Sequence, residues 1–384
     1  MTFGFSTVTR IVFGPGRASE AGVLSAANGS RVFIVLGGHP ARSGELIDRL
    51  RVRGLWVRIF QVTAEPTVGD VRRGVAEACE SECDVVLGSG GGSVLDAGKA
   101  IAALMTNPGD PLDYLEVIGA GKPLANLPAP YLALPTTAGT GTEATQNAVI
   151  ASPEHRIKVS LRSPLMFPRI ALVDPLLTAS CPPGVTAASG LDALTQLIEP
   201  FTCIQPNPMV DALCRDGIDR IRRSLRRAFE DGSDAAARED MALAALLSGM
   251  ALSNAKLGAV HGIAAPLGGM TKASHGAACA RLLPEVMDVN IRLLREGKGH
   301  PGALDRYAEI ARILTADAPA TPEAGAEWIR SLTVTFRIPP LSQFGLRIED
   351  FPVLAEKASQ ASSMKGNPVP LDVEDIVQIL SKVM

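Results

Sequence analysis

The sequence contains few aromatic residues, few histidines and no excess of one charge. Phe, Trp and Tyr together make up 4% of the 384 residues, so Ala, Val, Leu and Ile must fill the core. The 37 basic and 40 acidic side chains leave a formal charge of −3, which excludes the strongly basic surface typical of nucleic-acid binding. Gly, Pro or charged residues interrupt every apolar stretch well before the roughly 20 residues that a membrane span requires. The N-terminus also lacks the basic and apolar segments of a signal peptide. We therefore expect a cytoplasmic protein that binds neither nucleic acid nor membrane.

Length and cysteine content restrict the possibilities further. At roughly 150 residues per domain, a chain of 384 residues favours two domains. Cys79 and Cys83 are four residues apart, but no nearby second pair completes a zinc knuckle. We expect the six cysteines to be free thiols in a reducing compartment.

The two halves of the chain differ in their hydrophobic pattern. Short apolar runs at 32–36, 84–88, 131–134 and 170–173 alternate with amphipathic stretches at 43–53 and 68–79, as in a parallel sheet built from βαβ units. Beyond Pro182, long Ala- and Leu-rich segments such as 236–257 and 303–314 indicate a helical bundle. Proline and glycine between Asp174 and Gly184 mark the boundary, which gives an α/β domain over 1–180 and an all-helical domain over 181–384.

Two glycine-containing loops follow predicted strands. The strand at 84–87 leads into Gly88-Ser89-Gly90-Gly91-Gly92-Ser93, and a helix is predicted over 94–104. Such a turn lets backbone N–H groups and the positive end of a helix approach a phosphate, and Ser93 either caps this helix or donates to the phosphate. The second loop, 135–143, contains four threonines and two glycines. Two such loops at strand ends favour a nucleotide site over a merely flexible glycine turn.

A possible metal site lies in the helical half. Of five histidines, His261 and His275 have mostly apolar neighbours, as does Asp192, which Gln196 follows on the same helix face. One carboxylate and two imidazoles suit a divalent cation with a position left for substrate. The alternative from spacing alone is a set of buried hydrogen-bonded pairs.

At these motifs the sequence resembles the iron-containing (group III) alcohol dehydrogenase family over nearly its whole length. The resemblance is carried by ordered segments at 90–99, 135–143, 171–175, 190–194, 258–262 and 275–284. It implies a Rossmann-like dinucleotide-binding domain over 1–180, an all-helical metal-binding domain over 181–384, a cleft between them, and a homodimer that forms through 11–13. The implied reaction is hydride transfer between NAD or NADP and a small alcohol, aldehyde or ketone.

The resemblance also implies individual roles. Asp192, His261 and His275 would hold Fe²⁺ or Zn²⁺, which acts as a Lewis acid on the substrate oxygen. The coenzyme would be bound by Gly37, Gly91, Gly92, Ser93, Asp96, Thr136, Thr137, Thr140 and Lys158.

The chain departs from the family pattern at three positions. Gln196 replaces a fourth metal-binding histidine, so either three residues hold the metal or Gln196 is a weak ligand. Ala265 replaces a histidine that many members carry in the substrate cleft. Gly37 replaces an acidic residue that would bind the ribose 2′-OH and repel a 2′-phosphate, so we expect NADP to be accepted, with Arg42 as a phosphate partner.

Three other functions remain open at this point. One is a specialised carbonyl reductase similar to maleylacetate reductase, with little or no metal dependence. Another is a lyase similar to dehydroquinate synthase, and the third is a non-catalytic binding protein.

Overall fold

The protein folds into two compact units. The computed structural model describes residues 2–38, 43–155 and 157–384. One unit, here called the α/β unit, contains residues 7–137 and 141–180. The other, called the helical unit, contains residues 181–384 together with the segment up to Ser6 and the short segment Ala138–Thr140.

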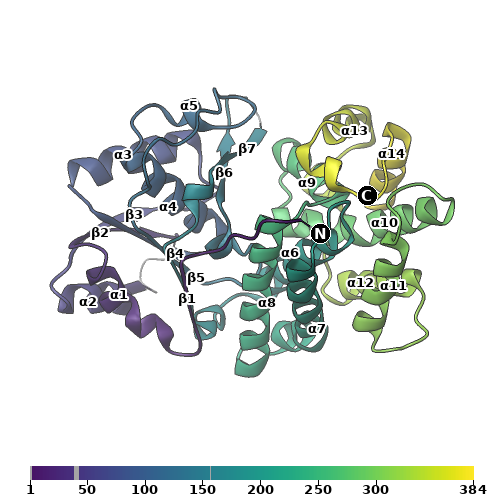
Figure 1. The fold of residues 1–384 in the computed structure, drawn as a ribbon, viewed down its shortest axis with the longest axis horizontal. Coiled ribbons are helices and arrows are strands. Elements are labelled where there is room, and N and C mark those ends of the chain that lie inside the picture. Colours follow the sequence, from purple (N-terminus) through teal and green to yellow (C-terminus); the bar gives the residue numbers. More distant parts are fainter. Residues whose placement is uncertain (1, 39–42, 156) are drawn as a thin grey trace. The chain divides into compact units, whose positions relative to one another are not determined.

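The α/β unit is built on a six-stranded parallel sheet with the strand order β1-β8-β5-β4-β2-β3 (Figure 1). Its strands are β1 (Arg10–Phe13), β2 (Arg31–Leu36), β3 (Trp56–Gln61), β4 (Val85–Gly90), β5 (Tyr131–Pro135) and β8 (Ile170–Val173). The helices between them are α1 (Ala21–Ala26), α2 (Gly44–Val52), α3 (Val68–Glu80), α4 (Gly92–Met105) and α5 (Pro111–Tyr114). All four predicted strands and all three predicted helices are present in this unit.

Helices cover both faces of this sheet. In β2, Val32, Ile34 and Leu36 belong to the core beneath α1 and α2, whereas Phe33 and Val35 belong to the core beneath α3 and α4. Side chains alternate between the faces of a strand, so a strand buried on both sides reads as a continuous apolar run. Figure 1 shows α2 and α3 on opposite sides of the sheet.

The glycine-rich turn starts later than the sequence pattern predicts. Gly88 and Gly90 are still part of β4, and the helix α4 begins at Gly92, two residues before the predicted start. A Cβ atom at Gly88 would lie 2.4 Å from the Tyr131 hydroxyl of β5. Close packing between β4 and β5 therefore requires glycine at position 88. The sequence pattern alone does not distinguish a glycine of this kind from a glycine in a turn.

A small antiparallel hairpin was not predicted. It consists of β6 (Asn147–Ser152) and β7 (Ile157–Arg162), and pairs Asn147 with Arg162 at one end and Ser152 with Ile157 at the other. Its apolar side chains pack with α4 residues such as Ala100 and Leu104 in a separate small core. The helix α4 thus packs against this hairpin as well as against the main sheet.

The helical unit has the all-helical character that the sequence predicts. Its α-helices are α6 (Pro183–Thr202), α7 (Pro208–Glu230), α8 (Ala235–Asn254), α9 (Ala259–Met270), α10 (His275–Arg295), α11 (Ala303–Thr315), α12 (Pro322–Thr335), α13 (Phe351–Ser359) and α14 (Val373–Lys382). They share one large apolar core. Together with the parallel sheet of the other unit, this confirms the predicted fold class.

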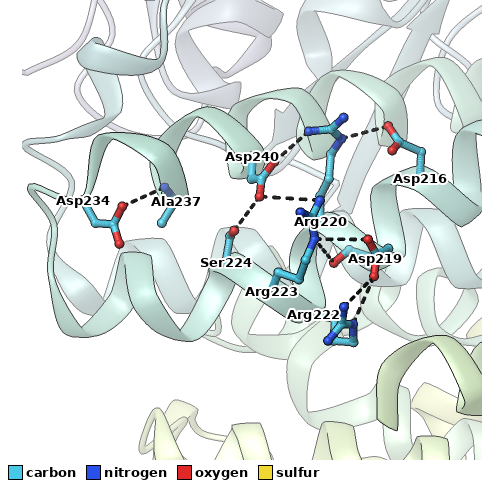
Figure 2. Close-up of polar contacts among 9 residues, drawn as sticks. All are labelled: Asp216, Asp219, Arg220, Arg222, Arg223, Ser224, Asp234, Ala237 and Asp240. Atoms are coloured by element: carbon cyan, nitrogen blue, oxygen red, sulfur yellow. Dashed lines mark hydrogen bonds and ion pairs between the residues drawn. The ribbon is translucent and has the colours of Figure 1, made fainter. Parts of the chain in front are cut away.

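Polar contacts join α7 and α8 beside this core (Figure 2). Arg220 donates to Asp216 at 2.8 Å within α7 and to Asp240 of α8 at 2.7 Å. The other oxygen of Asp240 accepts a hydrogen bond from the fully buried Ser224 hydroxyl at 2.7 Å. The contacts of Asp240 with Arg220 and Ser224 thus add polar links between α7 and α8 to the apolar core that the two helices share.

No single helix within the described residues is long and apolar enough to cross a membrane. The pair α8 and α9 passes the test of length and composition only when taken together, and it bends by 97°. Both helices contribute side chains to the core of the helical unit.

Candidate active site

The strand order of the main sheet reverses beside β2. The chain places β3 on one side of β2 and β4 on the other, then continues outward to β5. Ligands of open α/β sheets bind at the carboxyl ends of the strands where this reversal occurs. Here those ends are Leu36, followed by Gly37, and Gly90, which lies opposite Pro135 of β5. The two predicted coenzyme loops are therefore neighbours.

The start of α4 has the properties of a phosphate site. Gly91 occupies the N-cap position and no side chain caps the helix, so its first N–H groups point toward the strand end. A Cβ at Gly91 would lie 3.4 Å from the Thr137 methyl group, which brings these two predicted residues together. Ser93 is inside the helix, not at its cap, so the predicted capping role of Ser93 is wrong, because the helix begins earlier than expected.

A buried ionic cluster holds the second loop in place. The Lys99 ammonium group donates to the carbonyl oxygens of Thr142, Thr145 and Asn147 at 2.7, 2.8 and 2.9 Å. It also donates to the Thr145 hydroxyl at 2.8 Å. These bonds tie α4 to Thr142 at the end of the threonine-rich loop and to the residues that follow it, and Lys99 is 1% exposed.

Two carboxyl groups accompany Lys99. Burial raises the pKa of Glu143 to about 7, although its backbone hydrogen bond and the charge of Lys99 lower it. Burial likewise raises the pKa of Asp96, which accepts hydrogen bonds from the Val149 backbone and the Thr142 side chain. Burial also lowers the pKa of Lys99, against the opposing effect of both carboxylates. Asp96 therefore belongs to one cluster of charged groups with Lys99 and Glu143.

The remaining predicted coenzyme residues lie in several places. The Thr136 N–H donates to the Gly90 carbonyl at 2.9 Å, while Thr140 belongs to the short segment assigned to the helical unit. Lys158, on β7, forms an ion pair with Glu65 at 2.6 Å. Arg42 lies outside the described residues.

In the helical unit, three helices bring the predicted metal ligands together. Asp192 comes from the middle of α6, His261 from the first turn of α9, and His275 from the first position of α10. Asp192 Oδ1 lies 3.5 Å from His275 Nε2 and 3.9 Å from His261 Nε2. With the Cys279 thiol, these side chains offer four candidate metal-binding atoms that all lie within 4.8 Å of one another. We call Asp192, His261, His275 and Cys279 the donor group.

Glu199 determines which nitrogen of His261 faces this group. One Glu199 oxygen accepts from His261 Nδ1 at 2.6 Å and the other from the Val260 N–H at 2.7 Å. Burial lowers the pKa of His261, but the charge and hydrogen bond of Glu199, with the charge of Asp192, outweigh burial and raise it. With its proton on Nδ1, the ring presents the Nε2 lone pair, the usual arrangement for a metal-binding histidine.

Two buried polar atoms in this group test whether a cation fits. Among the described residues, neither Asp192 Oδ1 nor His261 Nε2 has a hydrogen-bond partner, and these residues are 1% and 7% exposed. A buried polar atom without a partner costs roughly 1–3 kcal/mol, and buried carboxylates need a compensating charge. A divalent cation that accepts both lone pairs satisfies both atoms, so these residues fit the predicted metal.

The positions that depart from the family pattern are also defined. Gln196, buried on α6, accepts a hydrogen bond at its Oε1 from the Ser248 hydroxyl at 3.0 Å. Ala265 is exposed on α9, one turn after His261. Neither position therefore presents an imidazole to the group.

Two residues of this site, Glu199 and Cys279, are not among the residues predicted from the sequence. Glu199 follows Asp192 by seven residues on α6, and Cys279 follows His275 by four on α10, so each lies on the same helix face as a predicted ligand. Helical spacing from the predicted ligands was the signal available in the sequence.

Comparison with known proteins agrees with this fold. The model described as "Iron-containing alcohol dehydrogenase" matches residues 8–175, and "Fe-containing alcohol dehydrogenase family, C-terminal" matches 186–384. Alcohol dehydrogenase 4 of Saccharomyces cerevisiae (strain YJM789) is 39% identical over 342 residues, which cover 88% of this chain and 86% of the relative.

Solved structures show the same likeness over the full length. The crystal structure of a 1,3-propanediol oxidoreductase is 32% identical, covers 100% of both chains and has a TM-score of 0.91. Sulfoacetaldehyde reductase from Bifidobacterium kashiwanohense, solved in complex with NAD⁺, is 27% identical with a TM-score of 0.88, and the match covers 100% of this chain and 99% of that one. The fold and the matches define an oxidoreductase of the alcohol dehydrogenase type. The chain belongs to the iron-containing alcohol dehydrogenase family.

Proposed function

We propose that this oxidoreductase transfers hydride between a nicotinamide coenzyme and a small alcohol or its aldehyde or ketone, with a divalent cation held by Asp192, His261 and His275. The observation that carries the proposal is that two buried atoms, Asp192 Oδ1 and His261 Nε2, have no hydrogen-bond partner among the described residues. When bound, Fe²⁺ or Zn²⁺ polarises the substrate oxygen as a Lewis acid.

The protein's own residues prepare this site. The Asp192 carboxylate supplies negative charge, and Glu199 holds the proton of His261 on Nδ1, away from the donor group. His275 begins α10, where the Ser274 hydroxyl caps the helix through the Ala277 N–H and so fixes where His275 stands. The side chain of His275 is 41% exposed, which gives a small substrate access to the donor group.

The α/β unit supplies the coenzyme site. The uncapped start of α4 binds the pyrophosphate at Gly91, Gly92 and Ser93, beside Thr137. The other residues that we assign to the coenzyme are Gly37, Asp96, Thr136, Thr140 and Lys158. The cluster around Lys99 keeps the threonine-rich loop in position for this task.

We further propose that NADP is accepted as well as NAD. Gly37 follows the carboxyl end of β2 and carries no acidic group that would repel a 2′-phosphate. Measurement of kcat/KM with both coenzymes tests this, and a strong preference for NAD would contradict it.

We also propose a cytoplasmic homodimer. All six cysteines are free thiols, as suits a reducing compartment. The strand β1 lies at an edge of the sheet, and its Ile11 is 37% exposed, so it can pair with a second copy. Light scattering gives the molar mass, and a monomer would contradict this assembly.

Metal removal and replacement test the main proposal. The purified protein is treated with a chelator, and coenzyme absorbance is followed with a panel of alcohols and aldehydes. We expect activity to disappear and to return with Fe²⁺ or Zn²⁺, while the coenzyme Kd stays the same. Full activity in metal-free protein would contradict the proposal and favour a metal-independent carbonyl reductase.

A further inference from the structure

The donor group holds a sulfur atom that the proposed three-ligand site does not use. Cys279 lies one helical turn after His275 on α10, and helical side chains lean toward the helix start, so its thiol points toward His275. The two donor atoms, Cys279 Sγ and His275 Nε2, are 3.7 Å apart. Cys279 is 0% exposed, so its sulfur faces the protein interior beside the site.

We propose that Cys279, and not Gln196, is the fourth protein ligand of the cation. This inference rests on the proposed function, because it concerns the same cation. Binding forms a metal–sulfur bond and breaks the S–H bond, and the released proton passes to the solvent.

The distances support a four-coordinate arrangement. Bond lengths of about 2.0 Å to nitrogen or oxygen and about 2.3 Å to sulfur place tetrahedral donors about 3.3 Å apart, or about 3.5 Å where sulfur is one of them. The measured separations are 3.7 Å from Cys279 to His275, 3.5 Å from His275 to Asp192, and 3.9 Å from His261 to Asp192. Side-chain movements of a few tenths of an ångström bring these separations to the tetrahedral values.

Gln196 is a poorer candidate for the fourth ligand. Its carboxamide oxygen already accepts a hydrogen bond from Ser248, whereas Asp192 Oδ1 and His261 Nε2 lack any such partner within the described residues. A neutral amide is also a weaker ligand for a transition metal than a thiolate. The chain thus compensates for the glutamine on α6 with a sulfur on α10.

Cobalt(II) provides the test, because thiolate ligation gives Co²⁺ a sulfur-to-metal charge-transfer absorption in the near ultraviolet that nitrogen and oxygen ligands do not give. The full-length protein, stripped by a chelator, is titrated with Co²⁺ alone, and the band and the Kd are both recorded. The variants are Cys279→Ala, Cys279→Ser, Gln196→Leu and the control Cys214→Ala. Cys214 is an equally buried cysteine in α7 outside the donor group.

We expect the band in the wild type, in Cys214→Ala and in Gln196→Leu, and its loss in both Cys279 variants. The Kd for Co²⁺ should rise at least about tenfold without Cys279 and stay within about threefold without Gln196. Stoichiometric Co²⁺ binding by the wild type without the band, or a band that persists in Cys279→Ser, would overturn this inference and leave the proposed function standing. A wild type that binds no Co²⁺ would overturn both. If Cys279→Ala fails to fold, the wild-type spectrum and Cys279→Ser still decide.

Discussion

Replacing Glu199 by glutamine should weaken metal binding without touching a ligand. Both Glu199 oxygens accept N–H groups, from His261 Nδ1 and from the Val260 backbone. Glutamine has one acceptor oxygen, so its NH₂ group must face one of these two donors. If it faces His261, the imidazole proton moves to Nε2 and occupies the lone pair that the cation needs.

The magnitude follows from this mismatch. A buried donor left without an acceptor costs about 1–3 kcal/mol, which corresponds to a roughly 5- to 150-fold rise in the metal Kd. Loss of a partner that orients a metal ligand typically costs about 10- to 100-fold in metal affinity. Glu199 is 5% exposed, so solvent offers little compensation.

The assay is competition for Zn²⁺ with a chromophoric chelator, alongside the coenzyme Kd and the histidine tautomer from nitrogen NMR. The matched control is Glu285→Gln, which changes a comparably buried carboxylate that pairs with Arg330 and Lys382. The control should lower stability but leave the metal Kd unchanged. An unchanged metal Kd in Glu199→Gln, with the His261 proton still on Nδ1, would refute the reasoning.

Three further changes test the α/β unit. At Gly37 a Cβ atom would lie 3.6 Å from Val94, an ordinary contact, so a side chain fits there. In Gly37→Asp, kcat/KM with NADP should be about tenfold or more lower than in Gly37→Asn, because the carboxylate repels a 2′-phosphate. Equal values in the two variants would contradict this. Lys99→Met should raise the coenzyme Kd at least about tenfold and leave the metal Kd unchanged, because three carbonyl groups, two of them buried, lose their donor. An unaltered coenzyme Kd would show that the loop does not depend on Lys99. Glu143, whose pKa rises from 4.5 to about 7 on folding, contributes stability that is fully present below about pH 4.5 and is lost as the pH rises through about 7. Across that range, urea unfolding should therefore show a loss of stability that is about 3 kcal/mol larger in the wild type than in Glu143→Gln. Equal losses in the two proteins would contradict the assignment.

Local pattern predicted much of the fold. The apolar run at 32–36 predicts a strand because both faces of β2 are buried, and the periodic segment at 68–79 predicts α3, whose start is fixed by a capping box from Thr67 to Asp70. The sequence pattern places the start of α4 too late, because it assigns Gly88 to a turn. Glycine is needed at this position because a Cβ atom would collide with the hydroxyl of Tyr131, 43 positions away, and no local pattern reveals that contact.

The ligand residues that lie within sequence motifs were predictable, whereas the residues whose roles depend on how the helices pack were not. Asp192, His261 and His275 stand out as polar residues in apolar segments, and the structure brings them together. The role of Glu199 depends on α9 lying against α6, and that of Cys279 on the close approach of α10 to α6. Only the fold supplies those contacts.

The most direct measurement is equilibrium binding of Zn²⁺ and Fe²⁺ to the chelator-stripped full-length protein, compared with Asp192→Asn. Asp192 Oδ1 is buried and has no hydrogen-bond partner among the described residues, which predicts one cation per chain in the wild type. In the variant the affinity should fall at least about a hundredfold, with the coenzyme Kd unchanged in both. A wild type that binds neither cation, or an Asp192→Asn variant that binds as tightly as the wild type, would contradict a metal site at these residues.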